Sequence, residues 1–417
     1  MFTLLFVALL IADTGVRLWL ASRQIRHVAQ HRDTVPGEFS ARIGLTSHQR
    51  AADYTVARVR LGMFERIYDA MILVGLTLFG GLQWLDTSLA QLTQVDFLRQ
   101  LLLLVCVALL LGLAGLPFTL WRQFRLESRF GFNRMTPGLF VSDTLKGLAL
   151  ALCLGLSLAS AILWLMASAG SLWWLWAWGL WTAFNLLLIF IAPTYIAPLF
   201  NKFTPLDDPE LTARIRGLAQ RCGFTLNGLF VMDGSKRSAH GNAYFTGFGK
   251  SRRIVFFDTL LSRLNADEIE AVLAHELGHF KRHHILKRIG LSLFMALVFF
   301  AVLGWLAQQP WFYVGLGVLP QLGGRNDAMA LILFFLVIPV FTFMFTPLAS
   351  WYSRRDEFEA DRYAAVQSSS GNLVSALVKL YDDNAATLTP DPVHSAFYDS
   401  HPPAAVRIRH LLAGATA

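Results

Sequence analysis

The chain has 417 residues, of which 55% are hydrophobic and only 15% are charged, whereas soluble globular domains carry about 25% charged residues. With 33 phenylalanines and 12 tryptophans, it has too much apolar surface to be a disordered chain. The three cysteines, Cys106, Cys153 and Cys222, lie far apart, which argues against a disulfide framework and against a cysteine-based zinc site. The composition therefore predicts a membrane protein.

Long apolar stretches predict seven transmembrane helices, because a helix crosses the bilayer core with about 20 apolar residues. The predicted spans lie at residues 2–21, 67–86 and 100–121, as a pair within 147–201, and singly within 289–324 and 328–353. Asp13 and Arg17 interrupt the first span, and we expect both to face protein or a wet interior, since a charge facing lipid is costly. A signal peptide is the alternative for this stretch, but it lacks a basic start. The predicted fold class is an all-α polytopic membrane protein.

Arginine-rich connections at residues 22–66 and 122–146 predict the orientation, because Lys and Arg accumulate in cytoplasmic loops. The N-terminus is then outside, and residues 202–288 and the tail 354–417 are cytoplasmic. Residues 1–201 form a region of five spans, and residues 289–353 add two more. The net charge of +8 fits contact with an anionic membrane face better than nucleic-acid binding, for which the sequence has no aromatic-interleaved basic motif.

Residues 202–288 are amphipathic and charged, which predicts a small α+β domain between the fifth and sixth spans. Residues 242–248 and 253–257 are rich in aromatic and β-branched residues and predict two short strands joined by residues 249–252. Asn265 followed by Glu268 is typical of a capping box, and apolar residues at helical spacing come next. A helix is therefore expected from about this point.

That helix carries His275-Glu276-Leu277-Gly278-His279, the pattern H-E-x-x-H. Two histidines four residues apart share one helical face and can reach a single ion, with Glu276 beside it. The alternative is a pair of surface histidines on a solvated face. The pattern lies on a predicted helix that follows a strand, which favours a zinc site in a zincin-like catalytic domain.

Catalytic zinc takes three protein ligands and leaves one position open. His283 and His284 follow closely, but a straight helix does not easily wrap three ligands around one ion. Glu357, just beyond the last predicted span, is the better candidate, and Asp361 one turn later could accept the N–H of a ligand histidine. Glu359 is a competing carboxylate. The alternative for the whole stretch is a charged helix end.

Taken together, these motifs resemble the CAAX prenyl endopeptidase family, the seven-span zinc metalloproteases of the a-factor-converting type, over nearly the whole chain. The resemblance is carried by H-E-x-x-H at residues 275–279, Glu357-x-x-x-Asp361, residues 240–245, residues 400–403 with Arg407, and residues 48–54 and 130–134.

The resemblance implies one Zn²⁺ per chain, bound by His275, His279 and Glu357. It also implies that Glu276 is the general base, which takes a proton from water and passes it to the leaving amine. Bound zinc would lower the pKa of that water and polarise the scissile carbonyl.

Further residues gain expected roles by the same analogy. His401 and Arg407 are candidates for stabilising the oxyanion or for orienting Glu357, the alternative being a tail histidine and a surface arginine. Asn242, Ala243 and Tyr244 resemble the edge strand on which such proteases hold the substrate backbone, the alternative being an ordinary strand.

The implied function is an integral-membrane zinc endopeptidase whose active site faces a membrane-embedded chamber. Its expected partners are membrane lipid and a peptide or protein substrate, lipidated or membrane-tethered. The composition, rich in Ala, Leu and Arg, is typical of a GC-rich bacterial genome, which suggests a bacterial inner membrane and a substrate other than a prenylated CAAX protein. Two rivals are a membrane quality-control metalloprotease of the heat-shock type, shorter with about four spans, and a transporter or scaffold with an unused protease domain.

Overall fold

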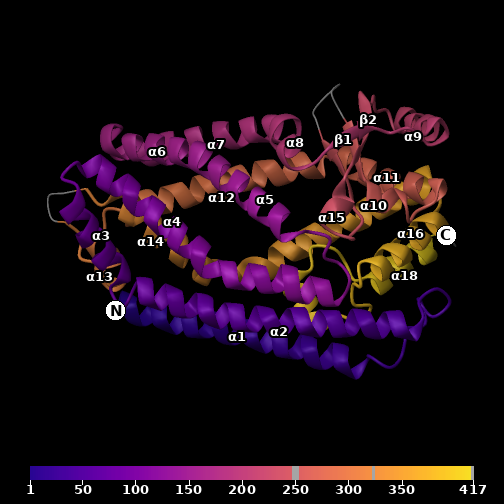
Figure 1. The fold of residues 1–417 in the computed structure, drawn as a ribbon, viewed down its shortest axis with the longest axis horizontal. Helices are drawn as coiled ribbons and strands as arrows, with labels where there is room; N and C mark the ends of the chain where they lie inside the picture. Colours follow the sequence, from indigo (N-terminus) through magenta and orange to yellow (C-terminus); the bar gives the residue numbers. More distant parts are fainter. Residues whose placement is uncertain (247–252, 322–324, 415–417) are drawn as a thin grey trace.

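The computed structural model describes residues 1–246, 253–321 and 325–414 (Figure 1). Long helices form most of the molecule. The helices of the membrane part are α1 (Phe2–Gln30), α2 (Leu45–Leu76), α3 (Gly81–Leu92), α4 (Asp96–Trp121), α5 (Pro137–Leu150), α6 (Leu156–Ser168), α7 (Trp173–Ile191), α8 (Ala197–Phe200), α12 (His284–Leu306), α13 (Pro310–Gly315), α14 (Asp327–Thr342) and α15 (Thr346–Gln367). In Figure 1, α1 and α2 run along one side of the molecule, and α6, α7 and α12 run along the opposite side.

Six helices or helix pairs of the described chain are long and apolar enough to cross a membrane, and α2 with α3 make a seventh if this bent pair is one span. With this pair counted as one span, the number agrees with the seven spans predicted from the sequence. The pair α2 and α3 is bent by 51°. Gly80 adopts a left-handed conformation there (φ 77°), and a Cβ at Gly81 would lie only 2.7 Å from the carbonyl oxygen of Gly75. The predicted second span therefore contains a sharp break that only glycine permits.

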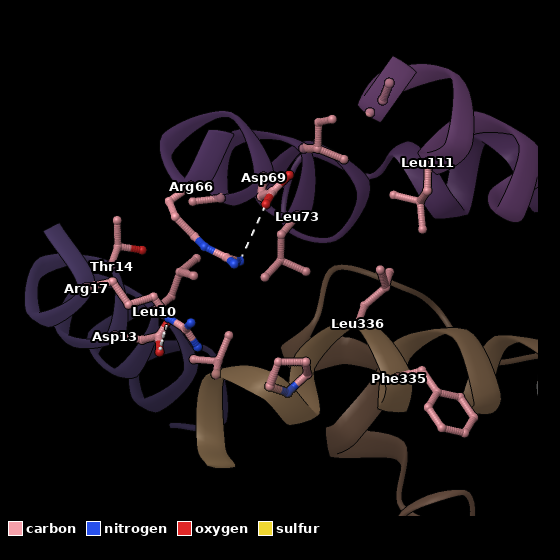
Figure 2. A pocket seen from close by; sticks show the side chains of 16 residues that line it. Leu10, Asp13, Thr14, Arg17, Arg66, Asp69, Leu73, Leu111, Phe335 and Leu336 are labelled. Carbon is pink, nitrogen blue, oxygen red and sulfur yellow. Dashed lines mark hydrogen bonds and ion pairs between the residues drawn. The ribbon is translucent and has the colours of Figure 1, made fainter. Parts of the chain in front are cut away.

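The charged residues of the first span pair with each other inside the protein, as expected. The Nε atom of Arg17 lies 2.9 Å from Asp13 Oδ1, and the two side chains are 15% and 11% exposed (Figure 2). The guanidinium of Arg17 also lies 3.6 Å from the ring centre of Phe343. Pairing and low exposure both reduce the cost of placing two charges within an apolar span.

A small mixed sheet forms the centre of the second part of the molecule. Its strands are β1 (Phe203–Pro205), β2 (Gly228–Met232), β3 (Ala243–Thr246) and β4 (Arg253–Phe257), in the order β1-β2-β4-β3. β2 and β4 are parallel, and the other two pairs are antiparallel. The two predicted strands are β3 and β4, and β3 is the last strand of the described sheet. Residues 247–252 of the predicted strand and turn lie outside the described residues.

Together with this sheet, further helices enclose a second hydrophobic core. They are α9 (Pro209–Arg221), α10 (Asp258–Leu261), α11 (Ala266–Lys281), α16 (Ser370–Asp383) and α18 (Ala404–Gly414). The short helix α17 (Pro392–Tyr398) packs instead against α15 and α1. The core joins Phe256 of β4 with Ala274 of α11 and Leu377 of α16, all buried. The helix that carries H-E-x-x-H is thus held between the sheet and the C-terminal helices.

α15 connects the two parts of the molecule. Residues 327–367 form one almost continuous helical stretch, which passes through residues 353–354 without a break. The stretch begins among the membrane helices and ends against α11. The carboxylates after the last predicted span therefore extend directly from a membrane helix.

The capping box at the start of α11 forms as predicted. The Asn265 side chain accepts a hydrogen bond from the Glu268 N–H, and the Glu268 carboxylate accepts one from the Asn265 N–H, both at 2.9 Å. The same carboxylate accepts hydrogen bonds from Lys379 (2.8 Å) and Ser375 (2.7 Å) of α16. Glu268 therefore ties the start of α11 to α16.

We expect Glu268→Gln to destabilise the protein by about 1–3 kcal/mol at neutral pH and by much less in acid. Burial opposes ionisation of Glu268, but hydrogen bonds from Lys379, Ser375 and Asn265 outweigh it and lower the pKa of the carboxyl. A lowered pKa adds stability above the ordinary carboxyl pKa, and this stability is lost as the pH falls through the lowered value. Unfolding of metal-free, detergent-purified protein at neutral pH and at about pH 3 measures the difference. The exposed Glu210→Gln on α9 is the control, and an equal effect of Glu268→Gln at both pH values would contradict this account.

Candidate active site

The two histidines of H-E-x-x-H meet on one face of α11. The Nε2 atoms of His275 and His279 lie 3.2 Å apart, and their rings are nearly perpendicular at 84°. His275 is buried and His279 is partly buried. Both Nε2 lone pairs are thus placed to bind one metal ion.

Glu357 comes to the same point from α15. Its Oε2 lies 3.4 Å from Nε2 of His275, and its Oε1 lies 3.4 Å from Nε2 of His279. The ligand atoms of these three residues all lie within 4.8 Å of one another, and they are the group that could hold a metal among the described residues. Glu357 Oε2 is buried and has no hydrogen-bond partner in the described chain. The donor set and this unpaired oxygen fit a metal ion.

A glycine lets the two ligand helices approach. A Cβ at Gly278 would lie 3.0 Å from the Cα of Ala360, 3.2 Å from its carbonyl oxygen and 3.2 Å from the Cβ of Tyr363. Two of these are backbone atoms of α15, which cannot rotate away. Gly278 therefore sets the separation at which Glu357 reaches the histidines.

We expect Gly278→Val to weaken metal binding about 10–100-fold, because the branched side chain pushes α15 away and displaces Glu357. Titration of metal-free protein with zinc measures this change. Gly290→Val on α12 is the control, since a Cβ there meets nothing within 4 Å. Equal zinc affinity in both variants would show that the helix separation does not matter.

Asp361 contacts the second ring nitrogen of His275. Its Oδ1 lies 2.9 Å from Nδ1 of His275, so the ring can donate its N–H there and direct Nε2 at the metal position. Arg407 of α18 donates to the same carboxylate, from Nε to Oδ2 at 2.9 Å and from Nη2 to Oδ1 at 2.5 Å. Both Asp361 and Arg407 are buried. Arg407 is farther from Glu357, with Nη1 4.0 Å from Oε2.

His401 stands at the open side of the site. Its Nε2 lies 3.5 Å from Glu357 Oε1, and its side chain is 60% exposed. Glu276 is partly buried beside the ligands. Burial raises the pKa of the Glu276 carboxyl, against the opposing charge of His275. A raised pKa suits a group that must both accept and return a proton near neutral pH.

His284 has a position that sequence reasoning did not foresee. Its Nδ1 lies 3.0 Å from Nδ1 of His279, and its Nε2 lies 3.3 Å from Glu359 Oε2. It therefore contacts the ring of His279 on the side away from Nε2, and the competing carboxylate Glu359 contacts His284 and not the two histidines of H-E-x-x-H. The helix is not straight here: α11 ends at Lys281, and His283 has a φ of 58°. The spacing alone carried no signal for this break.

The predicted substrate strand lies at the edge of the sheet. Ala243 and Tyr244 belong to β3, which pairs with β4 along one side only in the described sheet. Asn242 directly precedes β3, and its carbonyl accepts a hydrogen bond from the Phe257 N–H at 3.0 Å. An edge strand of this kind can pair with an extended peptide.

A cavity of about 660 Å³, here the site cavity, borders His401. Its wall also contains His240, Tyr54, Tyr381 and Asn384. His240 stacks on Phe132 at 4.4 Å, and its Nδ1 lies 3.0 Å from Asn384 Oδ1. The cavity is within the size range of ligand sites.

Comparisons with known proteins agree along nearly the whole chain. The family model "CAAX prenyl protease N-terminal, five membrane helices" matches residues 24–202, and the model "Peptidase family M48" matches residues 205–415. CAAX prenyl protease 1 of Saccharomyces cerevisiae is 32% identical over 96% of this chain and 93% of its own length. Its Homo sapiens homolog is 31% identical over 98% and 95%. The crystal structure of S. mikatae Ste24p is similar with a TM-score of 0.90, at 30% identity over 99% of both chains.

These matches join a five-helix membrane domain to a metallopeptidase domain in one chain. In the structure, α11 and α15 bring His275, His279 and Glu357 together in one group that could hold a metal ion. The chain therefore belongs to the CAAX prenyl protease family, within peptidase family M48, and is a multi-pass integral-membrane metalloendopeptidase.

Proposed function

We propose that the chain is a zinc endopeptidase that cleaves lipidated peptides of the CAAX type. The observation that carries this proposal is the buried group of His275, His279 and Glu357 with Glu276 beside it. The relatives named CAAX prenyl protease supply the substrate class.

The donor set supports zinc, one ion per chain. Two imidazoles and one carboxylate are the ligands of many catalytic zinc sites, with a further position left for water or substrate. His401 lies beside Glu357 and its side chain is 60% exposed, so the group is approached most easily from that side. When bound, zinc polarises the scissile carbonyl and lowers the pKa of a water.

The surrounding residues transfer the proton, orient the ligand histidine and stabilise the oxyanion. Glu276 takes the proton from the attacking water and returns it to the leaving amine. Asp361 fixes the orientation of the His275 ring, and Arg407 holds Asp361 in its ionised form. His401, at the open side, is placed to donate to the oxyanion that forms at the carbonyl carbon.

The peptide is expected to extend along β3. Asn242, Ala243 and Tyr244 present backbone groups at the sheet edge, and strand pairing there would bind any sequence in extended form. Backbone hydrogen bonds do not distinguish one peptide sequence from another, so substrate specificity must come from other contacts. We expect the lipid of the substrate to make such a contact.

To test this, the detergent-purified wild-type protein is assayed for cleavage of three substrates. They are a prenylated CAAX peptide, the same peptide without the lipid, and an unfolded protein. We expect cleavage of the prenylated peptide with the highest kcat/KM. Zinc-loaded protein that cuts only the unfolded protein would point to the quality-control protease. Metal-free protein that cuts nothing would favour the transporter or scaffold.

The topology is proposed on charge alone. The basic residues within 22–66 and 122–146, most of which lie inside helices in the structure, would be on the cytoplasmic side, with the N-terminus outside and the peptidase domain inside. A bacterial inner membrane was suggested by composition, but the relatives named above are eukaryotic and do not support it. Protease protection of tags at the two termini in sealed vesicles would test the orientation.

A further inference from the structure

A cavity of about 350 Å³, here the inner cavity, lies between α1, α2, α4 and α14 (Figure 2). Its apolar wall consists mostly of aliphatic side chains, among them Leu10, Leu73, Leu111, Leu336, Pro339 and Val340. Its polar wall has two ion pairs, one on each of α1 and α2. The residues are Asp13 with Arg17, and Arg66 with Asp69. The inner cavity is therefore amphipathic.

Shared lining residues relate the inner cavity to the site cavity through one cavity between them. A middle cavity of about 140 Å³ shares Arg17 and Arg66 with it. The middle cavity in turn shares Val59, His394 and Tyr398 with the site cavity, whose wall contains His401. Three cavities, each sharing lining residues with the next, thus extend from His401 to the apolar wall between the membrane helices.

The order of polar and apolar walls along this route restricts what can occupy it. The site cavity presents histidines, tyrosines and an asparagine, which suit a peptide. The two arginines stand where the middle and inner cavities meet, and hydrocarbon-lined space follows beyond them. The matching occupant has a polar peptide part joined to a hydrocarbon chain, in that order.

We propose that the inner cavity holds the hydrocarbon chain of a lipidated peptide substrate while its peptide part lies in the site cavity. The proposal deepens the proposed function and rests on it for the substrate class. Burial of the chain against the apolar wall supplies affinity that the sequence-independent β3 edge does not.

The wall of the inner cavity offers a position where it can be filled. Gly115 of α4 lines it, and a Cβ there meets nothing within 4 Å. A phenylalanine at this position would project into open space without a backbone clash. Gly112, one turn earlier on α4, also has nothing within 4 Å of its Cβ position but does not line the cavity. Gly115→Phe and Gly112→Phe are therefore a matched pair.

The first experiment uses a CAAX peptide with a photoreactive prenyl chain, bound to the inactive Glu276→Gln protein, with the labelled residues mapped by mass spectrometry. We expect labelling of cavity residues such as Leu73, Leu111 and Leu336, lost with Gly115→Phe and kept with Gly112→Phe. Labelling of outward-facing residues, or labelling that Gly115→Phe leaves unchanged, would overturn the proposal. Photoreactive phospholipid that labels the same residues and resists displacement by the peptide would make bilayer lipid the occupant, which also overturns it.

The second experiment compares kinetics of the prenylated peptide. Gly115→Phe should raise KM about tenfold with kcat nearly unchanged, because it removes binding far from the reacting bond, and Gly112→Phe should behave as wild type. Equal KM values for the two variants would count against the proposal.

The two experiments separate this proposal from the proposed function. If the wild type cleaves neither the prenylated nor the unprenylated peptide while the label maps to the inner cavity, the proposed function is contradicted and the binding of the hydrocarbon chain in the inner cavity is supported. If the wild type cleaves the prenylated peptide while the label maps elsewhere, the proposed function is supported and binding in the inner cavity is contradicted.

Discussion

Glu276→Gln is expected to lower kcat/KM about 10²–10⁴-fold while the protein keeps its zinc. The amide cannot accept the proton of the attacking water, but Glu276 is not one of the three residues whose ligand atoms converge. Glu357→Ala is expected to lose both zinc and cleavage, since it removes the ligand that joins α15 to α11. Metal analysis and cleavage of the prenylated peptide on the same samples measure both effects.

Glu359→Ala is the matched control for Glu357→Ala. Glu359 lies on the same helix, but its Oε2 contacts His284 and not the two histidines of H-E-x-x-H. It should retain zinc. Loss of zinc with Glu359→Ala and retention with Glu357→Ala would show that Glu359, and not Glu357, is the third ligand.

Arg407→Ala is expected to destabilise the metal-free protein by about 3–5 kcal/mol, because it leaves the buried carboxylate of Asp361 without its cation. Asp361 is fully buried, and Arg407 donates two hydrogen bonds to it. Thermal or denaturant unfolding in detergent measures this loss. Adding Asp361→Asn to Arg407→Ala should recover part of the stability, since the uncompensated charge is then removed.

Arg409→Ala is the control on the same helix. Arg409 is 63% exposed and pairs with Glu38 at 2.7 Å, and an exposed pair of this kind contributes about 0–1 kcal/mol. Similar destabilisation by the two arginine variants would mean that Arg407 acts as an ordinary surface residue. Loss of orientation at His275 should also reduce zinc affinity in Arg407→Ala about 10–100-fold, and should leave it unchanged in Arg409→Ala.

Sequence patterns within single helices were sufficient to predict much of the fold. Apolar stretches predicted the seven spans, and the capping box with its apolar spacing predicted the start of α11. The arrangement of His275 and His279 follows from the pitch of a single helix, so their spacing predicted that they face one point. Each of these features depends on residues that are close in the sequence, and local geometry is set by local chemistry.

The sequence favoured Glu357 as the third ligand, because Asp361 follows four residues later on the same helical face, but it left Glu359 as a competing carboxylate in the same charged stretch. The choice depends on how α15 packs on α11, which the close contact at Gly278 with Ala360 controls. The sequence shows a glycine in the motif but not the helix that comes against it.

Other features came only from the tertiary structure. The break at His283 turns His284 back to His279, and the C-terminal helix α18 brings Arg407 to Asp361 across 46 positions of sequence. Three cavities that share lining residues extend from the space between α1, α2, α4 and α14 to His401. The sequence by itself determined the membrane helices, the metal-binding helix and the class of chemistry, because those depend on periodicity and residue type. Which carboxylate completes the site, what supports it and where a substrate fits depend on contacts between distant segments, and only packing decides those.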